Sequence, residues 1–198
     1  RIIDSLAVAA AVSVAVSGSG PGVAVSAAGA VALNTIEGGF EASVVRSDVD
    51  ATGSVDVIAQ DSSAIQSMLF SAAISVSASG GAAAVGVAAS VALASNTIDG
   101  STLATIEDST VDSSAGAVTV EALSDASVQA FALSAAISAG GSSGVSVQVA
   151  AAGVVAFNTV TGSVEASIVG SRDADDDFGV EAAGDITASK QKQAFGET

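Results

Sequence analysis

A segment of 62 residues recurs along this chain, and a recurrence of that length limits the folds open to it. The triplet Asn34-Thr35-Ile36 returns as Asn96-Thr97-Ile98 and again as Asn158-Thr159-Val160. Further residues keep the same interval, namely Ala42, Ala104 and Ala166, and Val44, Ile106 and Ile168. A fixed period of this size is typical of chains that stack similar units on one another. We therefore predict a single repeat-built domain over residues 1–198, with three copies at approximately residues 8–69, 70–132 and 133–198.

Within each copy, hydrophobic residues alternate with small or polar ones, which is the period of a β-strand. Val12-Ser13-Val14-Ala15-Val16 and Val145-Ser146-Val147-Gln148-Val149 are examples. Dense Val, Ser and Gly disfavour a helix because they lose rotamer or backbone freedom there, and only the Ala-rich stretch at residues 82–94 leaves a helix in competition. We predict an all-β fold in which each copy has two long Ala/Val strands and then two shorter, more polar ones.

Turn-forming residues are expected to separate these strands. In the first copy they lie near residues 18–22, 34–39, 47–53 and 61–63, and in the second near residues 80–81, 96–100, 108–116 and 124–125. Thin strands of Val with Ala, Ser or Gly let sheets pack closely, but each side chain buries little apolar area. Stacking of one copy on the next must then supply more of the cohesion, as it does in a solenoid.

The charge of the chain is one-sided, with 21 Asp and Glu against five Lys and Arg and a formal net charge of −16. Such a chain repels phosphate backbones, so we expect no nucleic-acid partner. Anionic membrane surfaces are disfavoured for the same reason. Apolar stretches such as Leu6–Val16 are too short to span a bilayer as helices, and Ser and Gly interrupt them, so we also expect no membrane span.

The residue inventory excludes several kinds of catalysis. The chain has no Cys and no His, which removes Ser–His–Asp and Cys–His catalysis and Cys/His zinc sites. A glycosidase or lyase site on a solenoid would need convergent carboxylates or a basic residue beside the cleaved bond. None of the five basic residues recurs among the copies, namely Arg1, Arg46, Arg172, Lys190 and Lys192. We therefore predict that the protein is not an enzyme.

The strand phrases of the first two copies resemble a known kind of repeat. Ala42-Ser43-Val44-Val45-Arg46-Ser47-Asp48-Val49 and Ala104-Thr105-Ile106-Glu107-Asp108-Ser109-Thr110-Val111 are each followed by a Gly turn and Val-x-Val. They are similar to the β-helical repeats of giant bacterial surface exoproteins and adhesins, the filamentous-haemagglutinin-like proteins. The resemblance implies a right-handed parallel β-solenoid, secretion to the bacterial cell surface or beyond it, and an adhesive or structural role.

A 62-residue copy is long for one coil of such a solenoid, and two arrangements stay open at this stage. Each copy could contain two or three coils, or the long Ala/Val pair could form a hairpin. The chain opens on Arg1 without an initiator Met or a signal peptide, so we interpret it as a fragment of a longer polypeptide.

The third copy carries extra residues that include a run of aspartates, and Asp173, Asp175 and Asp177 are the candidate metal ligands. Asp at alternate positions followed by Gly179 resembles a calcium loop, in which carboxylate oxygens converge on a hard cation. The alternative is a solvated acidic loop extended by self-repulsion. The sequence establishes no cofactor, and calcium is the single candidate.

The recurrent Asn is the second candidate feature. An Asn side chain can stack on the equivalent Asn of the next copy and satisfy backbone groups at a bend, which favours a structural role over ligand binding. Together these observations predict the structural repeat region of a secreted bacterial surface or filament-forming protein, which assembles with copies of itself. The alternative is a calcium-dependent adhesin module that binds a glycan or a host surface.

Overall fold

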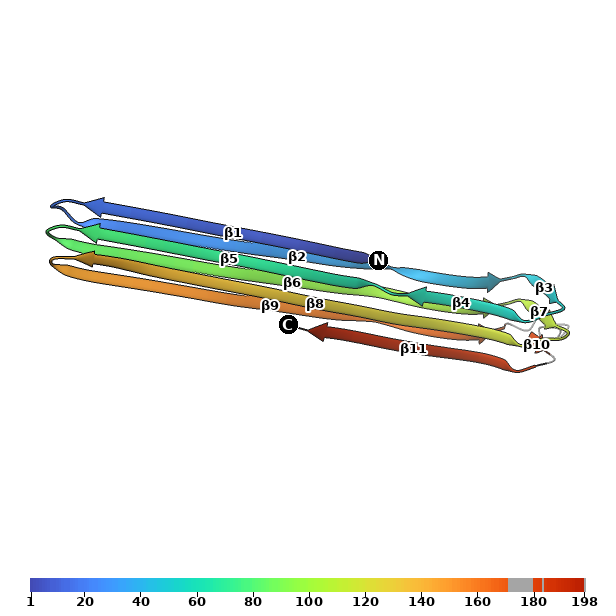
Figure 1. The fold of residues 1–198 in the computed structure, drawn as a ribbon. Coiled ribbons are helices and arrows are strands. Elements are labelled where there is room, and N and C mark those ends of the chain that lie inside the picture. The colour runs from blue at the N-terminus through green and yellow to red at the C-terminus, as the bar shows by residue number, and fades with distance from the viewer. Residues whose placement is uncertain (171–179, 183, 198) are drawn as a thin grey trace.

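The computed structural model describes residues 1–170, 180–182 and 184–197, and every regular element among them is a β-strand. The long strands lie side by side along one axis, and the short ones gather at one end of the molecule (Figure 1). In chain order the strands are β1 (Ile2–Ser17), β2 (Gly22–Val45), β3 (Asp48–Ala51), β4 (Val55–Asp61), β5 (Ala64–Ser79), β6 (Ala83–Glu107), β7 (Thr110–Ser113), β8 (Val118–Ser142), β9 (Val145–Val169), β10 (Val180–Ala182) and β11 (Ile186–Glu197). The prediction of an all-β fold is confirmed.

All strand pairing in the described residues is parallel, and it forms three sheets. Sheet A has the order β1-β5-β8-β11, with β4 also beside β8, and sheet B has the order β2-β6-β9. Sheet C is short, with the order β10-β7-β3. Parallel sheets of this kind are consistent with a β-solenoid-like fold.

The register of sheet B follows the interval found in the sequence. Asn34 lies opposite Asn96, and Asn96 lies opposite Asn158, so each strand pairs with the strand 62 residues further along the chain. Strands β1 and β2 are consecutive but belong to different sheets. Both arrangements that the sequence left open, the hairpin and the division of a copy into two or three coils, are therefore wrong. Among the described strands, no long strand pairs with another from its own copy.

Some predicted turns are real, whereas others lie inside strands. The chain reverses between Ser17 and Gly22 and again between Ser79 and Ala83. Residues 34–39 and 96–100, in contrast, are part of β2 and β6, and residues 124–125 are part of β8. The amides of Asn34 and Asn96 point inward and bond to neighbouring strands, which makes Asn compatible with an extended chain. Residues 82–94 form strand rather than helix from Ala83 onward.

In the half of the molecule that ends at the Ser17–Gly22 turn, the smaller of the alternating residues in the long strands face inward and the larger ones face outward. In β1 the partly buried positions include Ala7, Ala9 and Ala11, whereas Val8, Val12 and Val14 point outward and are 64–69% exposed. The space between sheets A and B in this half is filled mainly by Ala and Ser, with Leu69 as a fully buried larger side chain. Small inward side chains allow the two sheets to approach closely.

Larger side chains form a conventional core near the short sheet. Ala104, Ile106, Val111, Val118 and Val120 are fully buried there. Ala42, Val44, Ala166 and Ile168 pack against this cluster, as their common interval predicts. Ser43 faces solvent, but Thr105 is only 8% exposed because it is enclosed between neighbouring strands and its hydroxyl lies 3.3 Å from the Ser167 hydroxyl.

Candidate functional site

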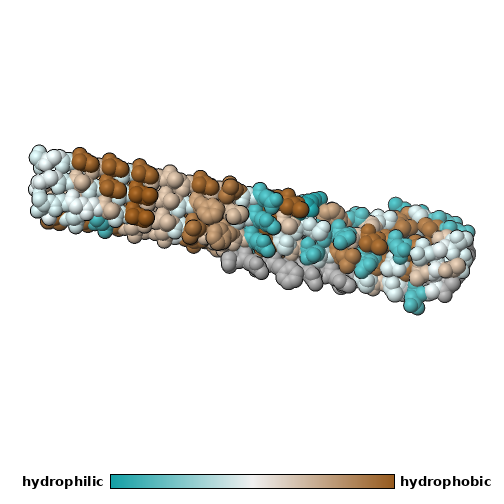
Figure 2. Space-filling view, in the orientation of Figure 1, coloured by the Kyte–Doolittle hydropathy of each residue, from teal (hydrophilic) through white to brown (hydrophobic). Residues whose placement is uncertain are grey.

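The half of the molecule that ends at the Ser17–Gly22 turn has no charged side chain. Charged residues are absent from residues 5–36, 67–98 and 126–164, and we call the part of the structure formed by these three segments the uncharged arm. On the face shown in Figure 2, hydrophobic residues form columns across the strands of one half, and hydrophilic residues gather toward the other. The apolar surface and the acidic surface are thus separated along the length of the molecule.

The outer face of sheet A in the uncharged arm consists of rows that run across β1, β5 and β8. Residues in a row are hydrogen-bonded neighbours in register. From the base of the arm to its tip, the six rows are Leu6, Met68 and Phe131; Val8, Phe70 and Leu133; Ala10, Ala72 and Ala135; Val12, Ile74 and Ile137; Val14, Val76 and Ala139; and Val16, Ala78 and Gly141. The alanine row is the floor of an apolar hollow that Val8, Phe70 and Leu133 border.

The aromatic rings on this face are in contact with each other. The centroids of Phe70 and Phe131 are 5.8 Å apart and the rings are tilted by 52°. Phe131 is 54% exposed although it has a ring neighbour. An exposed apolar area of this kind on a folded protein usually marks an interaction surface.

The outer face of sheet B is apolar as well, but its rows have a different order of sizes. Val25, Val87 and Val149 form one row, and Val31, Leu93 and Val155 form another. Between them lie a row of alanines and a row with two glycines, namely Ala27, Ala89 and Ala151, and Gly29, Val91 and Gly153.

Hydroxyl and amide groups connect the two sheets inside the arm. Asn34 Nδ2 donates to Asn96 Oδ1 at 2.7 Å, and Asn96 Nδ2 donates to Asn158 Oδ1 at 2.9 Å. Asn34 and Asn96 also donate across the interior to Ser5 and Ser67, at 2.9 and 3.0 Å. The structural role that the sequence indicates for the recurrent Asn agrees with this ladder.

A second polar connection lies closer to the tip. The Ser90 hydroxyl of sheet B donates to Ser71 of sheet A at 2.8 Å and accepts from Ser134 of sheet A at 2.9 Å. The buried hydroxyls therefore have partners that bind sheet to sheet, which a purely apolar interior of Ala could not provide.

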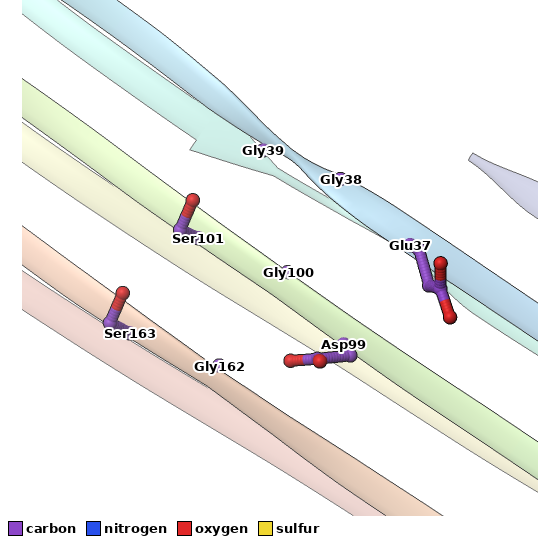
Figure 3. A pocket seen from close by; sticks show the side chains of 8 residues that line it. All are labelled: Glu37, Gly38, Gly39, Asp99, Gly100, Ser101, Gly162 and Ser163. Atoms are coloured by element: carbon purple, nitrogen blue, oxygen red, sulfur yellow. The ribbon is translucent and has the colours of Figure 1, made fainter.

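An open hollow lies on sheet B where the uncharged arm ends. Glu37, Asp99, Gly100 and Ser101 line it together with Gly38, Gly39, Gly162 and Ser163, and the side chains of Ser101 and Ser163 point the same way from neighbouring strands (Figure 3). Glu37 and Asp99 are in register, and Thr161 takes the third position. Two exposed carboxylates in an open hollow can attract a cation weakly.

The glycines beneath this hollow are there for steric reasons. Gly38, Gly100 and Gly162 lie in one row, and Gly38 and Gly162 have φ of 122° and 141°. A Cβ on Gly162 would overlap the carbonyl oxygen of Gly100. The hollow is therefore a consequence of close backbone stacking at a row in which two of the three glycines have positive φ.

The predicted calcium ligands Asp173, Asp175 and Asp177 lie outside the described residues, so the calcium loop remains a prediction. Within the described part of the chain, no three carboxylates come together in a way that could hold a metal ion. The described residues also contain no helix long and apolar enough to cross a membrane.

Comparison with known proteins gives no relative from which a site could be transferred. The sequence matches no family model and no curated protein, and the fold matches no solved structure. The exposed apolar faces of the uncharged arm are therefore the candidate functional surface on their own features. Sequence reasoning noted the Ala and Val alternation but missed the outward direction of Val, and the signal that could have found the arm was the three long intervals without charge.

Proposed function

We propose that this chain is a structural, self-assembling segment of a secreted bacterial surface protein or extracellular filament, built as three turns of a flattened β-solenoid of 62-residue copies. The observation that carries the proposal is the stacking of like on like across parallel strands, with Asn34, Asn96 and Asn158 as its clearest row. Such stacking has no built-in limit, because each strand offers its neighbour the same pattern of groups.

The ends of the stack support elongation. Among the described strands, β1, β2 and β9 each have a hydrogen-bonded neighbour on one side only. The other edge of each strand presents backbone N–H and C=O groups that can pair with a further strand. We propose that further strands with the same register add at these edges, so that copies of the chain extend end to end.

The resemblance to repeats of giant bacterial exoproteins supports secretion and a place at the cell surface. It also agrees with a mechanical role, which needs a long regular body rather than a catalytic cleft. The absence of Cys is compatible with an extracellular protein that does without disulfides. Adhesion to a glycan or a host surface is the alternative, and it depends on the calcium loop that lies outside the described residues.

Paired proline variants at the exposed edge strand test elongation. Ala150 and Ala151 are adjacent, exposed residues of β9, and successive N–H groups of a strand point to opposite sides. One of Ala150→Pro and Ala151→Pro therefore removes a donor from the free edge, whereas the other removes a donor from the ladder with β6. Electron micrographs of the unmodified chain should show rods longer than one copy, and the edge variant should shorten them while its melting temperature stays unchanged. Rods of unmodified length from both folded variants, or a strict monomer at high concentration and high salt, would contradict the proposal.

A further inference from the structure

We propose that the outer face of sheet A in the uncharged arm pairs with the same face of a second copy of this chain, with the strands of the two copies antiparallel. The inference rests on the proposed self-assembling function and adds to it a surface and an orientation. Elongation would proceed through strand edges, whereas this contact would join two rods side by side.

The shape of the sheets favours a partner on this face. The long strands of both sheets run straight and side by side over almost their whole length (Figure 1). Isolated sheets normally twist, and flat sheets are usually stabilised by stacking on another sheet. Sheet A has sheet B on its inner side, and among the described residues its outer side has no cover.

Side-chain sizes on this face are complementary about one point. Suppose that β8 of a second copy lies antiparallel over β8 of the first, with residue 136 opposite residue 136. Phe131 then faces Gly141 of the other copy, Leu133 faces Ala139, and Ala135 faces Ile137. Each contact joins a larger side chain to a smaller one, so ridges enter grooves. The same arrangement centred at residue 73 of β5 joins Met68 to Ala78, Phe70 to Val76 and Ala72 to Ile74.

Both strands give the same centre because residues 73 and 136 are register partners. Strand β1 has the equivalent centre at residue 11 and places Ala10 opposite Val12. One twofold axis across the three strands therefore matches larger to smaller residues throughout β5 and β8, and in β1 at all outward pairs except Val8 with Val14. Antiparallel pairing of this kind is isologous, so the interface closes with two copies.

The outer face of sheet B offers less apolar area for a contact of this kind. A centre at residue 26 also places a larger residue opposite a smaller one there, Val25 opposite Ala27. The outward residues around that centre are only Val, Ala and Gly, however, whereas Met68 and Phe131 lie on the outer face of sheet A. Because the gain from burial scales with apolar area, the larger side chains favour sheet A.

The charge distribution selects the orientation. The net charge of −16 opposes association, but the uncharged arm carries none of it. Antiparallel overlap of two arms places the acidic halves at opposite ends of the pair. Parallel overlap would instead place like charges side by side, which is unfavourable even with salt screening at a Debye length of about 8 Å.

The area is sufficient for a specific contact. The three strands from Leu6 to Val16 and their register partners cover roughly 500 Å² in projection, from typical strand spacing and rise. Two such faces bury about 1,000 Å², near the lower limit for a biological interface. The side chains that would be buried are now well exposed, as Val12 at 69% and Ile137 at 57% demonstrate.

A matched pair of lysine variants tests which face is used. Ile137→Lys places a charge at the centre of the sheet A face, and Val31→Lys places one on sheet B in the same arm at nearly the same exposure, 57% against 58%. Sedimentation velocity should give at least a tenfold weaker pairing for Ile137→Lys and unchanged pairing for Val31→Lys, with melting temperatures confirming that both fold. Loss of pairing only in Val31→Lys would overturn the proposal.

Cross-linking tests the orientation without dependence on a disruptive variant, because the chain has no Cys of its own. A short bismaleimide should join copies in a mixture of Leu133→Cys with Ala139→Cys, and neither variant should cross-link when it is alone. Cross-linking of Leu133→Cys to itself would mean parallel pairing and would overturn the proposal. Monomers that bind zwitterionic lipid vesicles through an Ile137-sensitive face would overturn it too, since the face would then serve lipid.

The two proposals fail in different ways. Long rods that stay single, with no effect of Ile137→Lys, would leave elongation intact and overturn the sheet A contact alone. Pairs that form through Ile137 but never elongate would support the contact and overturn elongation.

Discussion

At the scale of single residues, position in the stack decides what a side chain contributes. Asn96 is 1% exposed and takes part in three hydrogen bonds, one to each neighbouring Asn and one across the interior to Ser67. Buried polar groups cost free energy unless they are paired, and this row pairs them through identical residues. The Asn ladder therefore stabilises the register. A shift by one residue would place each Asn amide opposite a Thr or Ser and leave hydrogen-bond donors unpaired.

Replacing the central Asn of the ladder should weaken the fold. Asn96→Leu keeps the branched shape of the side chain but leaves the amides of its neighbours without one partner each, so we expect the free energy of unfolding to fall by at least about 2 kcal/mol. Thr35→Val, at an exposed position one residue from the ladder, should change it by less than about 0.5 kcal/mol. Chemical denaturation measures both, and equal stability of the two variants would contradict a structural role for the ladder.

Glycine substitution separates a required glycine from a tolerated one in the same strand. Gly162→Ala introduces a Cβ that overlaps the Gly100 carbonyl at a φ of 141°, and we expect a loss of at least about 2 kcal/mol in unfolding free energy. Gly153→Ala, with no heavy atom within 4 Å of its Cβ position, should be neutral or slightly stabilising. Thermal unfolding of both variants is the measurement, and a neutral Gly162→Ala would mean that the strands are not stacked at this row.

At the scale of strands, the uncharged arm has its small residues inside and its larger ones outside. Leu69 is fully buried among alanines, whereas Leu33 on sheet B is 73% exposed. The interior gains little apolar area per residue, so hydrogen-bonded ladders and the Ser and Asn contacts between sheets carry a larger share of the stability than in a core of Leu and Phe.

Two leucine truncations test this distribution in a monomeric preparation. Leu69→Ala leaves a cavity between the sheets and should cost about 2–5 kcal/mol. Leu33→Ala removes an exposed side chain and should cost less than about 0.5 kcal/mol. The opposite order of stabilities in denaturant titrations would mean that the faces of the strands are exchanged.

The candidate calcium loop lies outside the described residues, and it gives a prediction that can be tested in solution. Replacing Asp173, Asp175 and Asp177 with Asn removes three carboxylates, so any rise of melting temperature with millimolar calcium should disappear. If the unmodified chain shows no such rise, the segment is a solvated acidic loop and the calcium-dependent adhesin alternative is lost.

Sequence analysis predicts the strand class and the register, because Asn34-Thr35-Ile36 and its two later counterparts are distinctive and equally spaced. It does not predict which face of a strand is inside. Ala11 and Val12 are both apolar, so alternation alone has no polar side to orient it, and a shift of one residue would invert every side chain. The turns predicted at Asn34 and Asn96 are wrong because Asn favours turns when its amide has only local partners, and here the partners are on other strands.

At the scale of the whole molecule, parallel strands are stacked in register 62 residues apart in sheet B, and 62 or 63 residues apart from β1 to β8 in sheet A. From that arrangement follow the open strand edges, the rows of like residues and the separation of an uncharged arm from an acidic half. The apolar candidate surface could be anticipated only as a charge-free interval, because its row structure exists only once three strands lie side by side.

The most direct test is a distance between two spin labels on the outer face of sheet B. Thr35 and Thr159 are separated by one strand, so Cys residues at these positions would place their Cα atoms about 10 Å apart. Continuous-wave electron paramagnetic resonance of the doubly labelled monomer, diluted with unlabelled chain, should show strong dipolar broadening. Each singly labelled chain should show none. The absence of broadening in the folded double variant would contradict parallel stacking at this interval.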